Sequence, residues 1–409
     1  MPALRKVEIE AARRLALQAQ RLNGHSPSAS ADALHELMMQ LGCLQLDPTS
    51  AVAPSHLLVL WSRFGPYDQA LVDRLLWEER RWFEYFAHAA SIVSTIDFPI
   101  HRFEMRRYGR GDTTWEQRVR TFMEANASLR RSILVRLRRN GPLPARAFED
   151  MSQQSWQSSG WTNERNVGRM LDFLWITGRV LVSGRRGRTR LWDLAERVLP
   201  DWTPRERLSE SAVVERSAVR ALRALGVASA TEINRHFTRG RYPNLPRVLE
   251  RLERRGDIQR VDIGLNDRAA RFIHAADIET VAALERSEPP ARTTLLSPFD
   301  NLICDRERTA WLFGFDFKLE IYTPRSERKY GFFVMPVLHD GKLIGRLDPK
   351  FDREDGALKI NSVHLEPTAP SGRRVAQAVS SAVQDLATFL GAGEVRGPSA
   401  PSSWKKWLG

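Results

Sequence analysis

The residues best suited to chemistry are Gln45 and Asp47, which flank Leu46 and come directly before Pro48. A proline disfavours helical backbone at the preceding residue, so Asp47 is expected to be extended, with successive side chains on opposite faces. Gln45 and Asp47 would then point the same way, and Leu46 would point into the core. A carboxamide beside a carboxylate can orient and activate one water, as hydrolysis of a bond with a good leaving group requires.

The same pair also has a purely structural interpretation. Aspartate before proline often accepts hydrogen bonds from backbone groups at the exit of a helix. A helix is expected just upstream, since apolar residues recur at helical spacing over 31–41 and Gly42 suits the position after its end. Spacing alone favours the structural interpretation.

Composition limits the partners of the chain. Its 409 residues allow two to four domains, and the net charge of +13 indicates a polyanionic partner, either nucleic acid or an anionic membrane. No apolar run approaches the roughly 20 residues of a membrane span, and the first residues lack the apolar core of a signal peptide, so no membrane partner is expected. Cys43 and Cys304 are far apart, which is typical of a reducing cytoplasm.

One unit of helix, helix, helix and hairpin recurs three times, in the order of a winged helix, a helix-turn-helix variant. The copies are predicted at 7–22, 31–41, 67–78 and 82–93; at 132–139, 144–151, 163–177 and 180–191; and at 213–225, 230–237, 245–255 and 258–272. The first copy is looser than the others.

The pattern changes near residue 292 to short strands separated by turns. Strands are predicted at 311–317, 319–323, 330–338, 342–347 and 358–364, and a helix at 373–390. The fold is therefore expected to be α+β, with tandem winged-helix repeats followed by a β-rich, barrel-like module and a terminal helix. The predicted domains are 1–110, 111–205, 206–285 and 286–395, with a tail at 396–409.

Several motifs together resemble the YcaQ-like crosslink-repair DNA glycosylases, a family of tandem winged-helix proteins. They are 41–47 (LGCLQLD), 83–90 (FEYFAHAA), 312–315 (LFGF), 319–322 (LEIY), 328–331 (RKYG) and 345–348 (GRLD). The resemblance implies excision of N7-alkylated purines and unhooking of crosslinks through guanine N7 by a Gln-x-Gln or Gln-x-Asp motif, with Gln45 and Asp47 as the catalytic residues. The branch linked to antibiotic self-resistance has Gln at the second position, so Asp47 points to the broader crosslink-repair branch.

The chemistry of such lesions suits these two residues. Alkylation at N7 makes the purine cationic and a good leaving group, so one carboxylate can stabilise the sugar cation and activate water. No lysine lies between Lys6 and Lys318 to form a Schiff base, which predicts a monofunctional enzyme. Met1-Pro2 resembles glycosylases that use an amino-terminal proline, but Ala3 replaces their acidic residue and two cysteines cannot form their four-cysteine zinc finger. No metal-ligand spacing or phosphate-binding loop is present, so no cofactor is expected.

Other candidate residues lie in the predicted hairpins. Glu84, Tyr85 and His88 could line a lesion pocket, although a histidine among alanines is more often a core residue. Four arginines at the tip of the middle wing could contact phosphate or the minor groove, or form a solvated basic turn. These are Arg185, Arg186, Arg188 and Arg190. Asp300, Asn301, Asp305 and Arg306 are expected to be turn and salt-bridge residues.

The expected partner is double-stranded DNA with alkylated or crosslinked purines, bound by a monomer in the cytoplasm, at the nucleoid. A second hypothesis is a noncatalytic winged-helix DNA-binding protein or transcription regulator, in which the tripeptide is structural. It predicts a preferred DNA sequence and no release of bases. The glycosylase hypothesis instead predicts a shallow, solvent-open site around Asp47.

Overall fold

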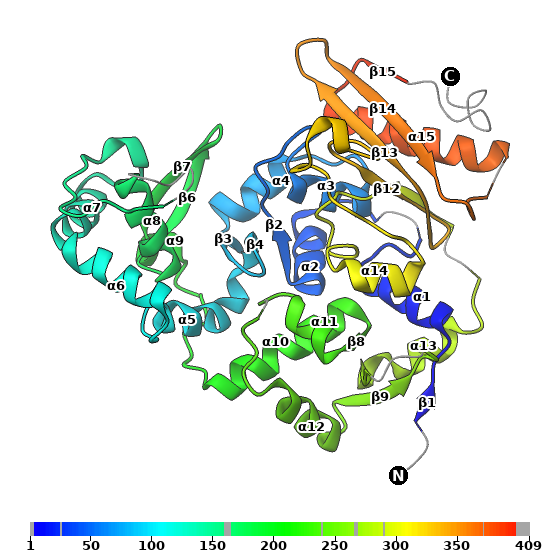
Figure 1. Cartoon of the computed structure of the whole chain (residues 1–409), viewed down its shortest axis with the longest axis horizontal. Helices are drawn as coiled ribbons and strands as arrows, with labels where there is room; N and C mark the ends of the chain where they lie inside the picture. The colour runs from blue at the N-terminus through cyan, green and yellow to red at the C-terminus, as the bar shows by residue number, and fades with distance from the viewer. Residues whose placement is uncertain are drawn as a thin grey trace. The chain divides into compact units, whose positions relative to one another are not determined.

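The computed structural model describes residues 4–24, 27–158, 165–238, 240–265, 269–288, 291–370 and 372–397 (Figure 1). The chain forms two compact units: unit 1 comprises residues 1–69 and 217–409, and unit 2 comprises 70–216. The predicted turn at 266–267 and the tail beyond 397 lie outside the described residues. Within the described ranges, no helix is both long and apolar enough to cross a membrane.

The first part of unit 1 carries the tripeptide. Its elements are β1 (Arg5–Lys6), α1 (Ile9–Ala19), α2 (Ala31–Leu41), β2 (Cys43–Gln45) and α3 (Ser55–Phe64). Helix α2 occupies the predicted residues because Ser30 accepts a hydrogen bond from the Ala33 amide at its start, while Gly42 adopts a φ of +84° at its end. Helix α3 was not predicted.

The third winged-helix copy begins with α10 (Glu210–Leu225), whose first residues lie in unit 2. The rest of this copy lies in the second part of unit 1. Its other elements are β8 (Val227–Ser229), α11 (Ala230–Arg235), α12 (Leu245–Arg255), β9 (Ile258–Asp262), β10 (Arg271–His274), η4 (Ala275–Asp277) and α13 (Ile278–Leu284). The predicted bounds of α12 are confirmed, since proline in its first turn and Gly256 after its last residue define both ends. Strand β1 extends this sheet by pairing in parallel with β9.

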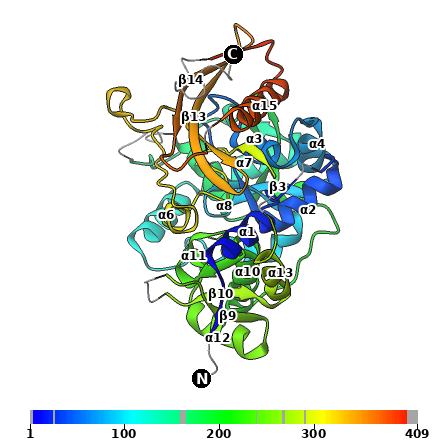
Figure 2. The same ribbon diagram turned by 90° about the vertical axis from the view of Figure 1, so that its right-hand side faces the viewer.

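The C-terminal module is an open, curled half-barrel of five strands in the order β11-β12-β13-β14-β15. The strands are β11 (Thr293–Leu295), β12 (Met335–His339), β13 (Lys342–Asp352), β14 (Ala357–Leu365) and β15 (Glu394–Arg396), and α15 (Arg373–Leu390) packs against β11 (Figure 2). The α+β class, the barrel-like module and the terminal helix are thus confirmed.

Two predicted strands, at 311–317 and 319–323, are wrong. Residues 306–313 form helix α14 (Arg306–Phe313), which Asp305 caps by accepting a hydrogen bond from the Arg308 amide. The buried Arg308 guanidinium donates to the carbonyl oxygens of Leu225 and Val227, both at 2.7 Å. These contacts with a distant segment favour the helix over the local apolar pattern. A turn follows in place of the second strand, since the Thr323 amide donates to the Glu320 carbonyl at 3.0 Å.

Unit 2 contains the hairpin that was predicted for the first winged-helix copy and the whole middle copy. Its elements are α4 (Ala70–Asp73), the π-helix η1 (Arg74–Glu78), β3 (Trp82–Phe86), β4 (Ala90–Ser94), η2 (Thr95–Asp97), α5 (Phe98–Arg107), α6 (Thr114–Ala125), α7 (Ala127–Asn140), β5 (Leu143–Pro144), η3 (Ala145–Ala147), α8 (Asn166–Ile176), β6 (Val180–Arg186), β7 (Thr189–Leu194) and α9 (Ala195–Val198). The predicted wing is the β6–β7 hairpin.

The helix predicted at 144–151 is wrong, because only a 3₁₀ turn, η3, forms there. Two buried asparagines hold the chain that follows. Asn126 Oδ1 accepts hydrogen bonds from the amides of Gln153 and Gln154, and Asn166 Oδ1 accepts one from the Trp156 amide at 2.8 Å. These side-chain contacts hold the backbone just beyond the predicted helix in a non-helical course.

The core of unit 1 contains a fully buried ion pair between Arg63 of α3 and Asp300. Arg63 Nη1 and Nη2 donate to the two carboxylate oxygens, the second at 2.9 Å, and Arg63 Nε donates to the Gln20 carbonyl at 3.0 Å. The predicted salt-bridge role of Asp300 is confirmed. The pair joins the end of α1, helix α3 and the segment that follows β11.

Replacing Asp300 with asparagine should lower the free energy of unfolding by about 3 to 5 kcal/mol, because the Arg63 charge stays buried without its counter-ion. Urea denaturation monitored by circular dichroism measures the change. Glu394→Gln breaks the exposed pair with Arg396 in the same unit and should leave the midpoint unchanged. Equal midpoints for both variants would contradict a stabilising role of the buried pair.

Candidate active site

The tripeptide lies where the chain passes from the core to the surface. Cys43 and Leu44 are fully buried, Gln45 and Asp47 are half-buried, and Pro48 is exposed. Leu46 is half-buried as well, rather than in the core as expected. Asp47 is therefore partly accessible and not sealed inside the unit.

Three side chains fix the backbone that leads into the tripeptide. Arg220 Nη1 donates to the Met39 carbonyl at 2.7 Å, Asn301 Nδ2 donates to the Cys43 carbonyl at 3.0 Å, and His236 Nε2 lies 3.3 Å from the Leu41 carbonyl oxygen. The Met39 and Leu41 carbonyls are among those that the end of α2 leaves unpaired, and the Cys43 carbonyl belongs to β2. The turn role predicted for Asn301 is confirmed.

Ser55 joins the two ends of the tripeptide. Its hydroxyl donates to the Gln45 carbonyl at 2.6 Å and accepts a hydrogen bond from the Asp47 amide at 3.2 Å. Ser55 is fully buried at the first position of α3. One hydroxyl on a rigid helix thus sets the spacing of the two candidate catalytic residues. Ser55 was not among the predicted site residues, because its contact with the tripeptide forms only when the loop of 48–54 folds back.

The Asp47 carboxylate also takes part in a local turn. Its Oδ1 accepts a hydrogen bond from the Thr49 amide at 2.8 Å, the contact that the structural interpretation predicts. Because a carboxylate can accept about four hydrogen bonds through two oxygens, the turn fixes the group and still allows it to bind a water.

The loop after Asp47 is fastened to the C-terminal half-barrel within unit 1. The Phe351 amide of β13 donates to the Ala51 carbonyl at 2.9 Å, and Arg353 Nη2 donates to the Val52 carbonyl at 3.2 Å. Val52 and Ala53 belong to the hydrophobic cluster that also contains residues of β12, β13 and α15. The half-barrel therefore supports the site.

The remaining candidates lie in unit 2, where the structure brings Glu84 together with two wing arginines. Glu84 is 1% exposed, and its carboxylate accepts hydrogen bonds from Arg185 Nε at 2.6 Å and Nη2 at 2.8 Å. Arg190 Nε lies 3.4 Å from the same carboxylate. A lone carboxylate in an aromatic strand could have suggested such a pairing, because a buried charge requires a counter-ion.

Tyr85 is buried, and its hydroxyl donates to the Ile176 carbonyl at 2.6 Å. His88 is half-buried in the turn between β3 and β4. Arg190 lies over the rings of Trp175 and Trp192, and burial lowers the pKa of its guanidinium. Arg186 and Arg188 are exposed at the tip of the wing, whereas Arg185 is also exposed but is bonded to Glu84.

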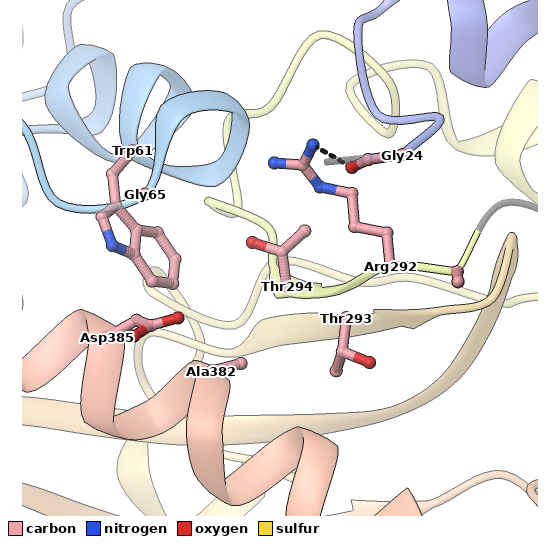
Figure 3. Close-up of a pocket in the computed structure, with 9 residues that line it drawn as sticks. Gly24, Trp61, Gly65, Arg292, Thr293, Thr294, Ala382 and Asp385 are labelled. Carbon is pink, nitrogen blue, oxygen red and sulfur yellow. Dashed lines mark hydrogen bonds between the residues drawn. The ribbon is translucent and has the colours of Figure 1, made fainter. Parts of the chain in front are cut away.

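A small polar cavity of about 200 Å³ lies elsewhere in unit 1 (Figure 3). Trp61, Thr294 and Asp385 line it together with Arg292, which donates to the carbonyl oxygens of Gly24 at 2.8 Å and Arg63 at 2.9 Å. Burial, and then the nearby Arg63 cation, lowers the pKa of Arg292 to about 10, so it stays charged at neutral pH. The lining contains neither catalytic candidate, and Arg292 has a structural role there. Among the described residues, no group of three or more histidine, cysteine or acidic side chains could hold a metal ion.

Ser55→Ala should speed hydrogen exchange of the Asp47 amide and lower stability by about 1 to 2 kcal/mol, because a buried hydroxyl bond is lost. Thr309→Val is the matched control: Thr309 is also buried on a helix of unit 1, α14, and its hydroxyl donates to the Asp305 carbonyl at 2.8 Å. It should lose similar stability without changing exchange at Asp47. Hydrogen–deuterium exchange mass spectrometry after peptic digestion distinguishes the two, and equal exchange at 45–49 in both would contradict the bridge.

A family model described as DNA glycosylase AlkZ-like matches residues 38–389. Among solved structures, the Streptomyces sahachiroi DNA glycosylase AlkZ has a similar fold, with a TM-score of 0.63, 16% sequence identity and coverage of 97% of this chain and 100% of that chain. At this identity the likeness shows the fold alone. Because the family match spans most of the sequence, the chain belongs to the AlkZ-like family of DNA glycosylases.

Proposed function

We propose that the protein is a monofunctional DNA glycosylase that hydrolyses the N-glycosidic bond of N7-alkylated purines and unhooks N7-guanine interstrand crosslinks. The observation that carries the proposal is the Ser55 bridge. The Ser55 hydroxyl fixes the backbone of Gln45 and Asp47 on either side of Leu46, at a position that is partly accessible to solvent. Membership in a DNA glycosylase family supports it.

In the proposed reaction, the bond between C1′ and N9 breaks and its electron pair leaves with the base, which neutralises the positive charge of the alkylated ring. The Asp47 carboxylate stabilises the oxocarbenium-like sugar and accepts a proton from the attacking water. Gln45 orients this water, because its carboxamide both donates and accepts hydrogen bonds. No strong general acid is required, since the base leaves as a neutral molecule.

The half-exposed position of Asp47 supports an action on bulky lesions. A base that is covalently joined to the opposite strand cannot swing freely into a deep pocket. A carboxylate at the surface of its unit can approach such a base with less rearrangement of the duplex. Crosslinks and simple methyl adducts are therefore both proposed substrates.

The Asp47–Thr49 turn favours one alternative, a noncatalytic winged-helix DNA-binding protein in which the tripeptide is structural. This alternative predicts sequence preference without base release.

Asp47→Asn should reduce base release from a duplex containing N7-methylguanine, and unhooking of a nitrogen-mustard crosslink, by about 100-fold or more, since the general base is lost. DNA affinity should stay within about twofold of the native protein. Release is read as alkali-sensitive abasic sites on a denaturing gel, and affinity by fluorescence anisotropy.

The matched control is Asp262→Asn, because Asp262 makes the same type of turn, accepting a hydrogen bond from the Gly264 amide at 2.9 Å in unit 1. Its activity should equal that of the native protein. Native-level release by Asp47→Asn would remove Asp47 from the mechanism, and no release by the native protein would favour the noncatalytic alternative.

The wing arginines should differ in their effects on DNA binding. Arg186→Gln should lower the slope of log affinity against log salt by about 0.9, as expected for one phosphate contact, without changing stability. Arg185→Gln should change the slope less and destabilise unit 2 by about 2 kcal/mol, because Glu84 loses its bidentate partner. Binding isotherms at four salt concentrations and thermal melts measure both quantities; identical slopes for the two variants would contradict this difference.

A further inference from the structure

The most exposed large hydrophobic side chain among the described residues is that of Tyr322, which is 85% exposed. It lies in the segment of 318–333, between α14 and β12, where a turn replaces the strand predicted at 319–323. An aromatic ring presented so fully to solvent is unusual in a folded protein and often marks a binding surface. A binding role for Tyr322 requires an ordered backbone around its ring.

The buried carboxylate of Glu320 binds the backbone of 329–331, in the second half of this segment. Glu320, directly before Ile321 and Tyr322, accepts hydrogen bonds from the amides of Lys329 at 3.0 Å, Tyr330 at 2.8 Å and Gly331 at 3.1 Å. Glu320 is itself buried. One side chain thus closes the segment into a loop with Tyr322 on its outer part.

A second carboxylate fastens the same loop to the half-barrel. Asp348 of β13 accepts hydrogen bonds from the amides of Phe332 at 3.1 Å and Phe333 at 2.8 Å. Gly331 has a φ of +145° and passes so close to Asp348 that a Cβ there would lie 2.3 Å from its carboxyl carbon. Together the two carboxylates accept five backbone hydrogen bonds, so the loop is a built structure.

The tip of the loop is closed as well. The Thr323 amide donates to the Glu320 carbonyl at 3.0 Å, and Arg328 Nε donates to the Thr323 carbonyl at 2.8 Å. The Arg328 guanidinium also lies over the Phe332 ring, 4.9 Å from its centroid. Tyr322 therefore sits in a turn that is fixed on both sides while its ring faces solvent.

Basic residues flank Tyr322 along the segment. Lys318, Arg325 and Lys329 are exposed, and Arg328 is half-exposed, whereas Asp316 and Glu327 are the exposed carboxylates of 316–332. Exposed aromatic rings among basic side chains are the pattern by which proteins stack on nucleic-acid bases while binding phosphates. The excess positive charge favours a polyanionic partner over an acidic or neutral protein surface.

The loop is built on the same core as the candidate active site. Ile321, the neighbour of Tyr322, belongs to the hydrophobic cluster that contains Val52 and Ala53 from the loop after Asp47. Both loops lie in unit 1 and both are hydrogen-bonded to β13. The loop that carries Tyr322 is therefore fixed in position relative to the loop that follows Asp47.

We propose that Tyr322 stacks on a DNA base beside the lesion, with Arg325, Lys329 and Lys318 at the neighbouring phosphates. The stacked ring holds the duplex open where a crosslinked base cannot be extruded. That the stacked base lies beside a lesion rests on the proposed function, whereas the contact between Tyr322 and DNA does not depend on it.

The test compares Tyr322→Ala, Tyr322→Leu and Tyr322→Phe in the full-length protein. The probe is a fluorescein-labelled duplex with 2-aminopurine beside a tetrahydrofuran abasic-site analogue, which needs no base release. Tyr322→Ala and Tyr322→Leu should weaken binding by roughly fivefold to a hundredfold, as for loss of one base stack, and should abolish quenching of 2-aminopurine. Tyr322→Phe should behave like the native protein, and all three should melt at the native temperature.

The outcomes separate this inference from the proposed function. Native affinity and quenching in Tyr322→Ala would overturn the stacking contact, whatever the activity on N7-methylguanine. Native quenching in Tyr322→Leu would also overturn it, since an aliphatic side chain cannot stack in the same way. Weaker binding by Tyr322→Ala, together with no base release by the native protein, would support the contact and reject the glycosylase proposal.

Discussion

The geometry of unit 1 depends on the buried charge of Arg63. Its guanidinium is bound to both oxygens of Asp300 and to the Gln20 carbonyl, so one side chain fixes three segments that are distant in sequence. The next residue after Asp300 is Asn301, which donates to the Cys43 carbonyl two residues before Gln45. The ion pair and the candidate active site are therefore parts of one connected structure, and the desolvated charges are stable only in this arrangement.

The candidate site is positioned mainly through its backbone. Carbonyl and amide groups on either side of Leu46 are bonded by Ser55 and Asn301, while the loop that follows is bonded to β13. Chemistry on a cationic purine requires few protein groups, because the substrate already provides the leaving group. In the proposed reaction, Asp47 and Gln45 would supply the carboxylate and the carboxamide from a backbone that Ser55 holds on either side of Leu46.

Much of the fold could be predicted wherever local signals were complete. Helices α2, α12 and α15 have the predicted bounds, because apolar periodicity and terminal glycines agree at each. Helix α14 overlaps the strand wrongly predicted at 311–317, because its apolar run lacks a clear helical stripe and its stability depends on the contacts of Arg308 with a distant segment. The Glu84–Arg185 pair joins residues 101 positions apart, so the aromatic strand around Glu84 indicates that a counter-ion is needed but not which arginine provides it. The domain boundaries at 110, 205, 285 and 395, and the roles of Gln45 and Asp47, remain predictions.

The interrupted course of unit 1 along the chain has a consequence for its synthesis. Unit 2 ends at residue 216, and Asp300 follows 84 positions later (300 − 216). Unit 2 can therefore fold on the ribosome before Asp300, the counter-ion of Arg63, has been synthesised. Helices α1 and α3 must remain solvated, or be protected by a chaperone, until the second part of unit 1 emerges. The order of synthesis thus allows unit 2 to fold first, and unit 1, which carries the candidate active site, to fold last.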